Sequence, residues 1–125
     1  MKKNKKILVT GANGFVGSHM LDYLLSKQKY KIYGLIKINA QKRNIKHLLS
    51  KVDFIEGDVT DRVSTDVIIN KLKPDYIYHF AALSWVSPSW NMPSAYFNVY
   101  AIGTINLLES VRKYNTNSKI LVSCT

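Results

Sequence analysis

The sequence predicts an α/β fold, a doubly wound parallel sheet with helices on both faces. One observation is the stretch 7–17, in which a short apolar run leads into three glycines, each separated from the next by two residues: Gly11, Gly14 and Gly17. A second observation is the alternation of short apolar runs with helical patterns of apolar residues along the rest of the chain, which is typical of parallel sheets. We interpret Ile7–Val9 as the first, buried strand.

The turn between this strand and the following helix has the properties of an anion site. Free backbone N–H groups and the helix dipole both face a phosphate that approaches a helix N-terminus. Gly11 allows the tight turn, Gly14 the close approach of a pyrophosphate, and Gly17 the packing of the helix on the strand. A plain strand-to-helix turn is the alternative, but both flanking elements that the motif requires are present. We therefore predict a dinucleotide site with cofactor contacts from Gly11, Asn13, Gly14, Phe15, Val16 and Gly17.

The remaining elements follow from hydrophobic periodicity and from capping and breaking residues. Helices are expected at 14–28, at about 45–49, from Thr60 or Asp61 to about Leu72, and from Pro93 or Ser94 to about 114. Strands are expected at 31–36, 52–55, 76–80 and 119–123. Right-handed crossovers then favour the strand order 3-2-1-4-5, the first half and more of a Rossmann-type fold. We expect one such domain over residues 1–125, without the C-terminal part of the full fold and without a substrate domain.

Composition agrees with this domain and narrows the function classes. The 125 residues are 46% hydrophobic and 21% charged, which suits one domain with a core of its own. No stretch approaches the roughly 20 consecutive apolar residues of a membrane span, and the basic N-terminus does not continue as a targeting segment. The single cysteine, Cys124, is compatible with a reducing compartment. We expect a cytoplasmic protein without a membrane segment or a metal centre.

The net charge of +10 raises the question of nucleic acid. The lysines are scattered, however, and most lie where helices end or strands begin, as on a solvated rim. We therefore expect no nucleic-acid partner and interpret the charge as an attraction for an anionic small molecule. Nucleic-acid binding stays a competing function, which a steep salt dependence of DNA affinity would favour.

Ligands of parallel α/β sheets bind at the carboxyl ends of the strands, so the residues there are candidates for the site. The second strand ends in Lys37, with Lys42 and Arg43 close behind, where an NAD site usually has an acidic residue. A cation suits the 2′-phosphate of NADP. We therefore expect NADP as the cofactor; the alternative is NAD, with Lys37 an ordinary surface lysine.

The third and fourth strands end in further candidates. The carboxylate of Asp58 is placed to accept a hydrogen bond from the amino group of adenine, whereas Asp61 is better explained as a helix cap. The small residues Ala81 and Ala82 would let a flat cofactor lie against the backbone. We interpret His79 as a packed strand histidine rather than as a catalyst.

Four segments together resemble the extended short-chain dehydrogenases/reductases that act on nucleotide sugars. They are Thr-Gly-Ala-Asn-Gly-Phe-Val-Gly at 10–17, Gly-Asp-Val-Thr-Asp at 57–61, His-Phe-Ala-Ala at 79–82, and the stretch from Asn98 to Glu109. Their order and spacing agree over essentially the whole chain. Within the family, the basic end of the second strand and residues 74–79 and 84–93 are most similar to GDP-mannose 4,6-dehydratases and the related reductases and epimerases.

The resemblance implies further binding residues. The cofactor contacts that it implies beyond the glycine turn are Lys37, Asp58, Val59, Ala81, Ala82, Leu83 and Asn98. It also implies a nucleotide-sugar substrate of the GDP-mannose type, contacted by Ser84 and Trp85, and a homo-oligomeric full-length enzyme. Trp85 and Trp90 suit either stacking against a sugar or guanine or packing against a second domain. Leu83 is a departure, because family members commonly have Gln there.

The resemblance also implies a mechanism. In the family, NADP⁺ takes a hydride from sugar C4, the C5 proton and the C6 hydroxyl leave as water, and the hydride returns to C6. A Ser/Thr hydroxyl at the end of the fifth strand, a Glu two residues later and a Tyr-x-x-x-Lys pair serve these steps. Thr125 falls on the Ser/Thr position and is the candidate catalytic residue.

The other catalytic groups have no counterpart in the sequence. The Glu would fall two positions after Thr125, and Tyr23 with Lys27 belongs to the first helix. We therefore expect the N-terminal, cofactor-binding part of an NADP-dependent dehydratase, inactive alone. An epimerase or reductase of the same family, and a non-catalytic dinucleotide-binding module or redox sensor, are the alternatives.

Overall fold

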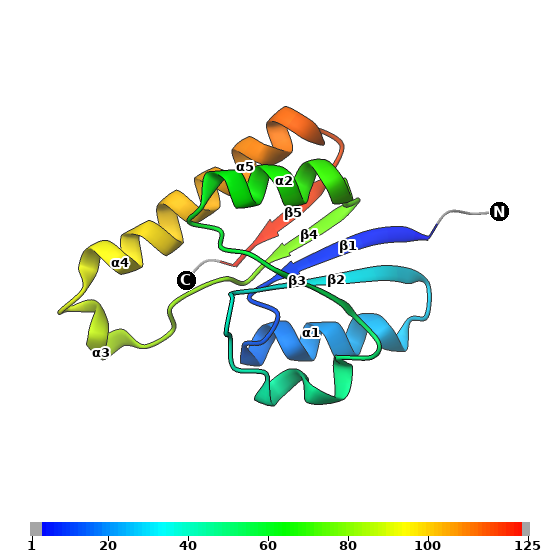
Figure 1. Cartoon of the computed structure of the whole chain (residues 1–125), viewed down its shortest axis with the longest axis horizontal. Coiled ribbons are helices and arrows are strands. Elements are labelled where there is room, and N and C mark those ends of the chain that lie inside the picture. Colours follow the sequence, from blue (N-terminus) through cyan, green and yellow to red (C-terminus); the bar gives the residue numbers. More distant parts are fainter. Residues whose placement is uncertain (1–3, 124–125) are drawn as a thin grey trace.

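Residues 4–123 are described by a computed structural model, in which five strands form one sheet with helices on both faces (Figure 1). All neighbouring strands are parallel and follow the order β3-β2-β1-β4-β5. The strands are β1 (Lys5–Thr10), β2 (Tyr30–Ile36), β3 (Asp53–Glu56), β4 (Tyr76–His79) and β5 (Lys119–Val122). The predicted fold class and strand order are confirmed. The bounds of the strands differ from the predicted ones by no more than one residue, except that β1 begins two residues before the predicted Ile7.

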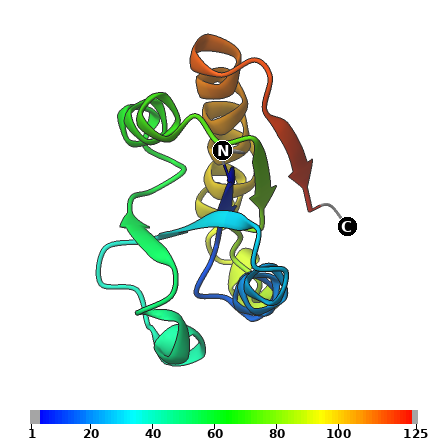
Figure 2. The same ribbon diagram turned by 90° about the vertical axis from the view of Figure 1, so that its right-hand side faces the viewer.

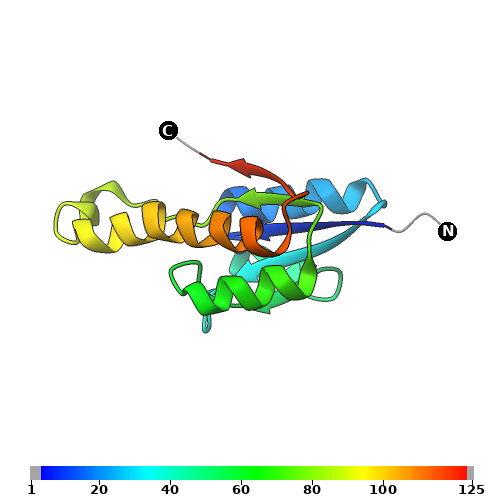
Figure 3. The ribbon, with the colours of Figure 1, turned by 90° about the horizontal axis from the view of Figure 1, so that it is seen from above.

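Helices cover both faces of the sheet (Figures 2 and 3), and two apolar layers fill the space between them and the sheet. The helices that form these layers are α1 (Phe15–Ser26) and the 3₁₀-helix η1 (Arg43–Leu48) on one face, and α2 (Arg62–Leu72) and α5 (Gly103–Tyr114) on the other. In β1, Ile7 and Val9 belong to the first layer and Leu8 to the second, and each is at most 1% exposed. Because β1 is buried on both faces, its apolar run is uninterrupted rather than alternating.

The segment after β4 differs most from the prediction. The short helix α3 (Val86–Ser89) was not predicted, and the long helix predicted from residue 93 or 94 to 114 is divided into three parts. These parts are α4 (Pro93–Phe97), the π-helical η2 (Asn98–Ile102) and α5, which follow one another in one direction (Figure 1). α3 and α4 project beyond the carboxyl ends of the strands, so this arm lies beside the edge where ligands bind in such sheets.

The helix signals of the sequence have the predicted effect at α2. Asp61 is the N-cap, and its Oδ1 accepts a hydrogen bond of 2.9 Å from the backbone N–H of Val63. Lys73 adopts a left-handed conformation with φ of 46° at the end of the helix, and Pro74 follows it. Within residues 4–123, no helix combines the length and the apolar character that crossing a membrane requires.

Candidate functional site

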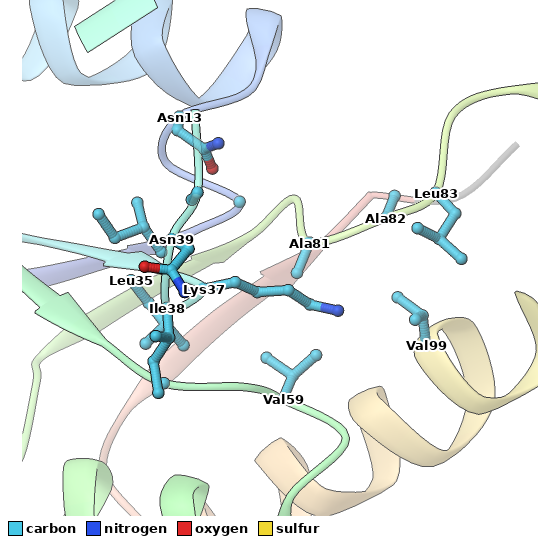
Figure 4. A pocket seen from close by; sticks show the side chains of 14 residues that line it. Asn13, Leu35, Lys37, Ile38, Asn39, Val59, Ala81, Ala82, Leu83 and Val99 are labelled. Atoms are coloured by element: carbon cyan, nitrogen blue, oxygen red, sulfur yellow. The ribbon is translucent and has the colours of Figure 1, made fainter. Parts of the chain in front are cut away.

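A cavity of about 410 Å³ lies at the carboxyl edge of the sheet (Figure 4). Seven of the residues predicted to bind the cofactor line it: Gly11, Asn13, Lys37, Val59, Ala81, Ala82 and Leu83. An adjoining hollow of about 260 Å³ shares Gly11, Asn13 and Ala82 with it and is completed by the first turn of α1, Phe80 and Ser84. The topology therefore brings together residues that follow β1, β2, β3 and β4, as expected for the ligand site of a parallel sheet.

The glycine turn has the close backbone contacts that its sequence predicts. Gly11 has a φ of 62°, and a Cβ there would lie 2.6 Å from the carbonyl oxygen of Phe80. A Cβ at Gly17 would lie 2.2 Å from the carbonyl oxygen of Gly11. Gly14 is the N-cap of α1 and has no side chain to cap the helix, so the first turn of α1 borders the smaller hollow uncovered. This turn offers backbone N–H groups to an anion.

A larger residue at position 17 is therefore expected to destabilise the fold. In Gly17→Ala, the helix or the turn must shift to relieve the contact with Gly11, at a cost of about 1–3 kcal/mol in the free energy of unfolding. Urea unfolding of wild type and variant measures this loss. Gly14→Ala is the matched control, because its Cβ would come no closer than 3.2 Å to the same oxygen. Equal stability of Gly17→Ala and wild type would contradict the prediction.

Thr10 and His79 form a buried hydrogen-bond network behind the turn. Thr10 Oγ1 accepts hydrogen bonds of 3.1 Å from the backbone N–H groups of Phe80 and Ala81, and lies 2.7 Å from Nδ1 of His79. Since the hydroxyl already accepts twice, it donates its proton to Nδ1. The neutral imidazole therefore carries its proton on Nε2, which donates to Thr104 Oγ1 at 3.1 Å. The network fixes the backbone at 80–81, which faces the glycine turn.

The interpretation of His79 as a packed strand histidine agrees with its environment. His79 is 4% exposed, and burial lowers the pKa of its imidazole below the ordinary value of 6.5. The unfolded chain therefore binds a proton at His79 near pH 6.5, whereas the folded chain binds it only at lower pH. The stabilising contribution is present above pH 6.5 and is lost as the pH falls through the pKa of the folded state.

We expect the free energy of unfolding to fall as the pH is lowered below 6.5. One proton contributes a slope of at most about 1.4 kcal/mol per pH unit. Urea unfolding at several pH values between 7.5 and 5 measures the slope, and His79→Gln should have a shallower one. An NMR titration of the His79 ring gives a second readout, and protonation at or above pH 6.5 in the folded protein would contradict the assignment.

Lys37, which lines the cavity, forms an ion pair with Asp58, which does not line it but lies between the lining residues Gly57 and Val59. The side chain of Lys37 runs across the cavity in Figure 4, and its Nζ lies 3.3 Å from Oδ2 of Asp58. Oδ1 of Asp58 accepts hydrogen bonds of 2.9 and 2.8 Å from the backbone N–H and the hydroxyl of Thr60. Partial burial alone would raise the pKa of Asp58, but these hydrogen bonds and Lys37 outweigh it and hold the pKa below its ordinary value. The Asp58 carboxylate is thus ionised and held beside Lys37.

The other predicted site residues lie at different distances from this cavity. Ser84 borders the smaller hollow, whereas Trp85 and Trp90 lie in the arm and are 79% and 84% exposed. Asn98 begins the π-helical segment and does not line the cavity. Thr125, the predicted catalytic residue, lies outside the described residues.

Sequence reasoning missed several lining residues. Val99, next to Asn98, lines the cavity opposite the end of β4, and Ile38, Asn39 and Ala40 line it from the segment after β2. Val99 was missed because residues 98–102 are π-helical, and the α-helical period used to read the sequence does not predict which face of such a turn a residue occupies. The signal for the second group was the absence of any apolar pattern after Lys37, which marks a loop at a strand end.

The sheet order, the glycine turn and a cavity at the carboxyl edge define a Rossmann-type α/β protein. Comparison with known families narrows this class. The family described as GDP-mannose 4,6 dehydratase matches residues 8–125. The chain therefore belongs to this family, within the nucleotide-sugar epimerases and dehydratases of the extended short-chain dehydrogenases/reductases.

Individual relatives include both dehydratases and epimerases. The chain is 34% identical to GDP-mannose 4,6 dehydratase 1 of Arabidopsis thaliana, over 94% of this chain and 35% of the relative. It is 32% identical to CDP-paratose 2-epimerase of Salmonella typhi, over 96% of this chain and 36% of the relative. A crystal structure of UDP-glucose 4-epimerase from Thermus thermophilus in complex with NAD is 31% identical, with a TM-score of 0.78, over 87% of this chain and 34% of that one. The chain thus spans about a third of the length of these proteins.

Proposed function

We propose that this chain provides the cofactor-binding part of an NADP-dependent nucleotide-sugar 4,6-dehydratase of the GDP-mannose type. The observation that carries the proposal is the cavity in which the glycine turn, Lys37 and the small residues after β4 meet, with Asp58 paired to Lys37. The family match supports the substrate class, and the dehydratase and epimerase relatives support an enzyme that acts on a nucleotide sugar.

The residues of the two hollows suit the parts of a dinucleotide. The uncapped first turn of α1 would hold the pyrophosphate through backbone N–H groups. Val59 and the Asp58 carboxylate would contact the adenosine, and Ala81 and Ala82 would let the nicotinamide half lie against the backbone after β4. When bound, the dinucleotide would accept a hydride from the sugar and return it. Ser84, at the border of the smaller hollow, is placed to contact the substrate.

Lys37 supports NADP rather than NAD. Its ammonium group lies at the cavity, and no carboxylate follows β2 at the position where NAD sites hold the ribose 2′-hydroxyl. The ion pair with Asp58 is more than a third exposed on both sides, and such pairs contribute little free energy. A 2′-phosphate can therefore take Lys37 as its partner at little cost.

We expect Lys37→Ala to weaken NADPH binding by about tenfold, because a charge-assisted hydrogen bond to phosphate is lost. NADH has no 2′-phosphate, so its affinity should change less than about twofold. Titration of each dinucleotide by calorimetry measures both constants. Lys71→Ala serves as the control, because it removes an exposed lysine in the last turn of α2 that does not line this cavity. Tighter binding of NADH than of NADPH by the wild type would overturn the choice of NADP.

The proposal includes the inactivity of the 125-residue chain alone. Two Tyr-x-x-x-Lys sequences occur among residues 4–123. Tyr23 and Lys27 lie on α1, where the ammonium lies over the tyrosine ring, and neither residue lines the cavity. Lys37 lines the cavity, but Tyr33 is buried in the apolar layer beneath α2 and α5 and does not line it. Incubated with NADP⁺ and GDP-mannose, the chain should bind the dinucleotide but form no 4-keto-6-deoxy sugar, as followed by NMR. Turnover would contradict this part of the proposal.

An epimerase is the second candidate function. CDP-paratose 2-epimerase and UDP-glucose 4-epimerase match the chain at 32% and 31% identity, close to the dehydratases. The cofactor cavity serves either reaction, since both begin with hydride transfer from the sugar. Dinucleotide binding by this chain is common to the two candidates, so substrate turnover by a protein that carries the remaining catalytic groups distinguishes them.

A further inference from the structure

A pair of hydrogen bonds joins the glycine turn to the segment after β2. Asn13 Nδ2 donates to the backbone carbonyl of Gln41 at 3.0 Å, and Asn44 Nδ2 donates to the backbone carbonyl of Asn13 at 3.1 Å. The two bonds connect residues about 30 positions apart in the chain. Neither asparagine side chain bonds to its own element, so both are used to hold one segment against the other. We call this pair the asparagine clamp.

The clamp holds the middle of a segment whose two ends are fixed in other ways. At the start, Ala40 donates its backbone N–H to Lys37 O at 3.1 Å, and Asn39 adopts a left-handed φ of 59°, which closes a turn. At the end, Ile45 and Leu48 are 0% and 1% exposed in the apolar layer beneath α1. Gln41 to Asn44 are all exposed, so packing does not hold them. Their position relative to the glycine turn depends on the clamp.

The segment that the clamp positions is cationic. Residues 37–51 contain five lysines and arginines and no Asp or Glu: Lys37, Lys42, Arg43, Lys46 and Lys51. In Rossmann-type sites, the ribose of the adenosine lies between the glycine turn and the end of the second strand. A 2′-phosphate on this ribose would face the segment that joins the two. An unclamped segment would have to be ordered when the phosphate binds, at a cost in conformational entropy.

We propose that Asn13 and Asn44 are positioning residues that set the preference for NADP over NAD, by fixing the cationic segment 37–44 beside the glycine turn. The proposal rests on the proposed function, in which the cavity binds a nicotinamide dinucleotide. In this role the two asparagines need not touch the cofactor themselves. They act on the 2′-phosphate through the cations whose place they fix.

The test compares the affinities of NADPH and NADH in wild type and in Asn44→Ala. Asn44 is exposed and lies on the first turn of η1, so its truncation leaves the buried Ile45 and Leu48 in place. We expect the dissociation constant of NADPH to rise about 3- to 10-fold, the range that one net hydrogen bond accounts for. That of NADH should change less than about twofold. Amide hydrogen exchange at 40–44 should become faster in the variant, and exchange in α5 should not.

Two further variants sharpen the comparison. Asn70→Ala removes an exposed asparagine from α2 and should leave both dissociation constants unchanged. Asn13→Ala removes the bond to Gln41, and in the double variant with Asn44→Ala the two losses of NADPH affinity should be less than additive, because both act through one clamp.

The outcomes separate the inference from the proposed function. An equal loss of NADPH and NADH affinity in Asn44→Ala, or no change in either, would overturn the clamp as a specificity device. A wild type that prefers NADH overturns the choice of NADP and, with it, the clamp as the source of such a preference, whereas the binding of a nicotinamide dinucleotide by the cavity would stand. A wild type that binds neither dinucleotide overturns the proposed function, and the clamp inference with it.

Discussion

The site depends on how closely the turn after β1 approaches the backbone after β4. Gly11 permits this approach for two reasons. It adopts a φ of 62°, and a Cβ at this position would lie only 2.6 Å from the carbonyl oxygen of Phe80, so no larger residue fits. Thr10, one residue earlier, then bonds to the N–H groups at 80 and 81. Here the turn and residues 80–82 form one continuous wall for a flat ligand.

The same contact reaches the long helix through His79. Its Nε2 donates to Thr104, so α5 is placed relative to β4 by a buried polar bond as well as by apolar packing. Gly103 makes this possible, since a Cβ there would lie 2.8 Å from Val59 Cγ2. The π-helical turn that precedes Gly103 then brings Val99 to the cavity. One hydrogen-bond network thus holds β1, β4 and α5 in place relative to one another.

The sequence was informative where a residue has one structural reason to be present. The run Ile7–Val9 and the glycines predicted the buried strand, the turn and the strand order, because burial on both faces and close backbone contact each require particular residue types. Val99 and the residues after Lys37 were missed, because their places depend on a π-helical turn and on tertiary hydrogen bonds. Neither the π-helical turn nor these hydrogen bonds produce a repeating pattern of residues that the sequence would show. Likewise, the charge of Lys37 was evident, but its pairing with Asp58 was not.

This pairing bears on how the cavity treats a charged ligand. Lys37 and Asp58 neutralise each other across an exposed contact, whereas Thr60 holds Asp58 through two hydrogen bonds that do not involve Lys37. Departure of Lys37 toward a phosphate therefore leaves Asp58 oriented and still ionised, because the Thr60 bonds favour the carboxylate form. The carboxylate stays fixed while the lysine is free to exchange partners. In the proposed function, Lys37 would serve the 2′-phosphate and Asp58 the amino group of the adenosine.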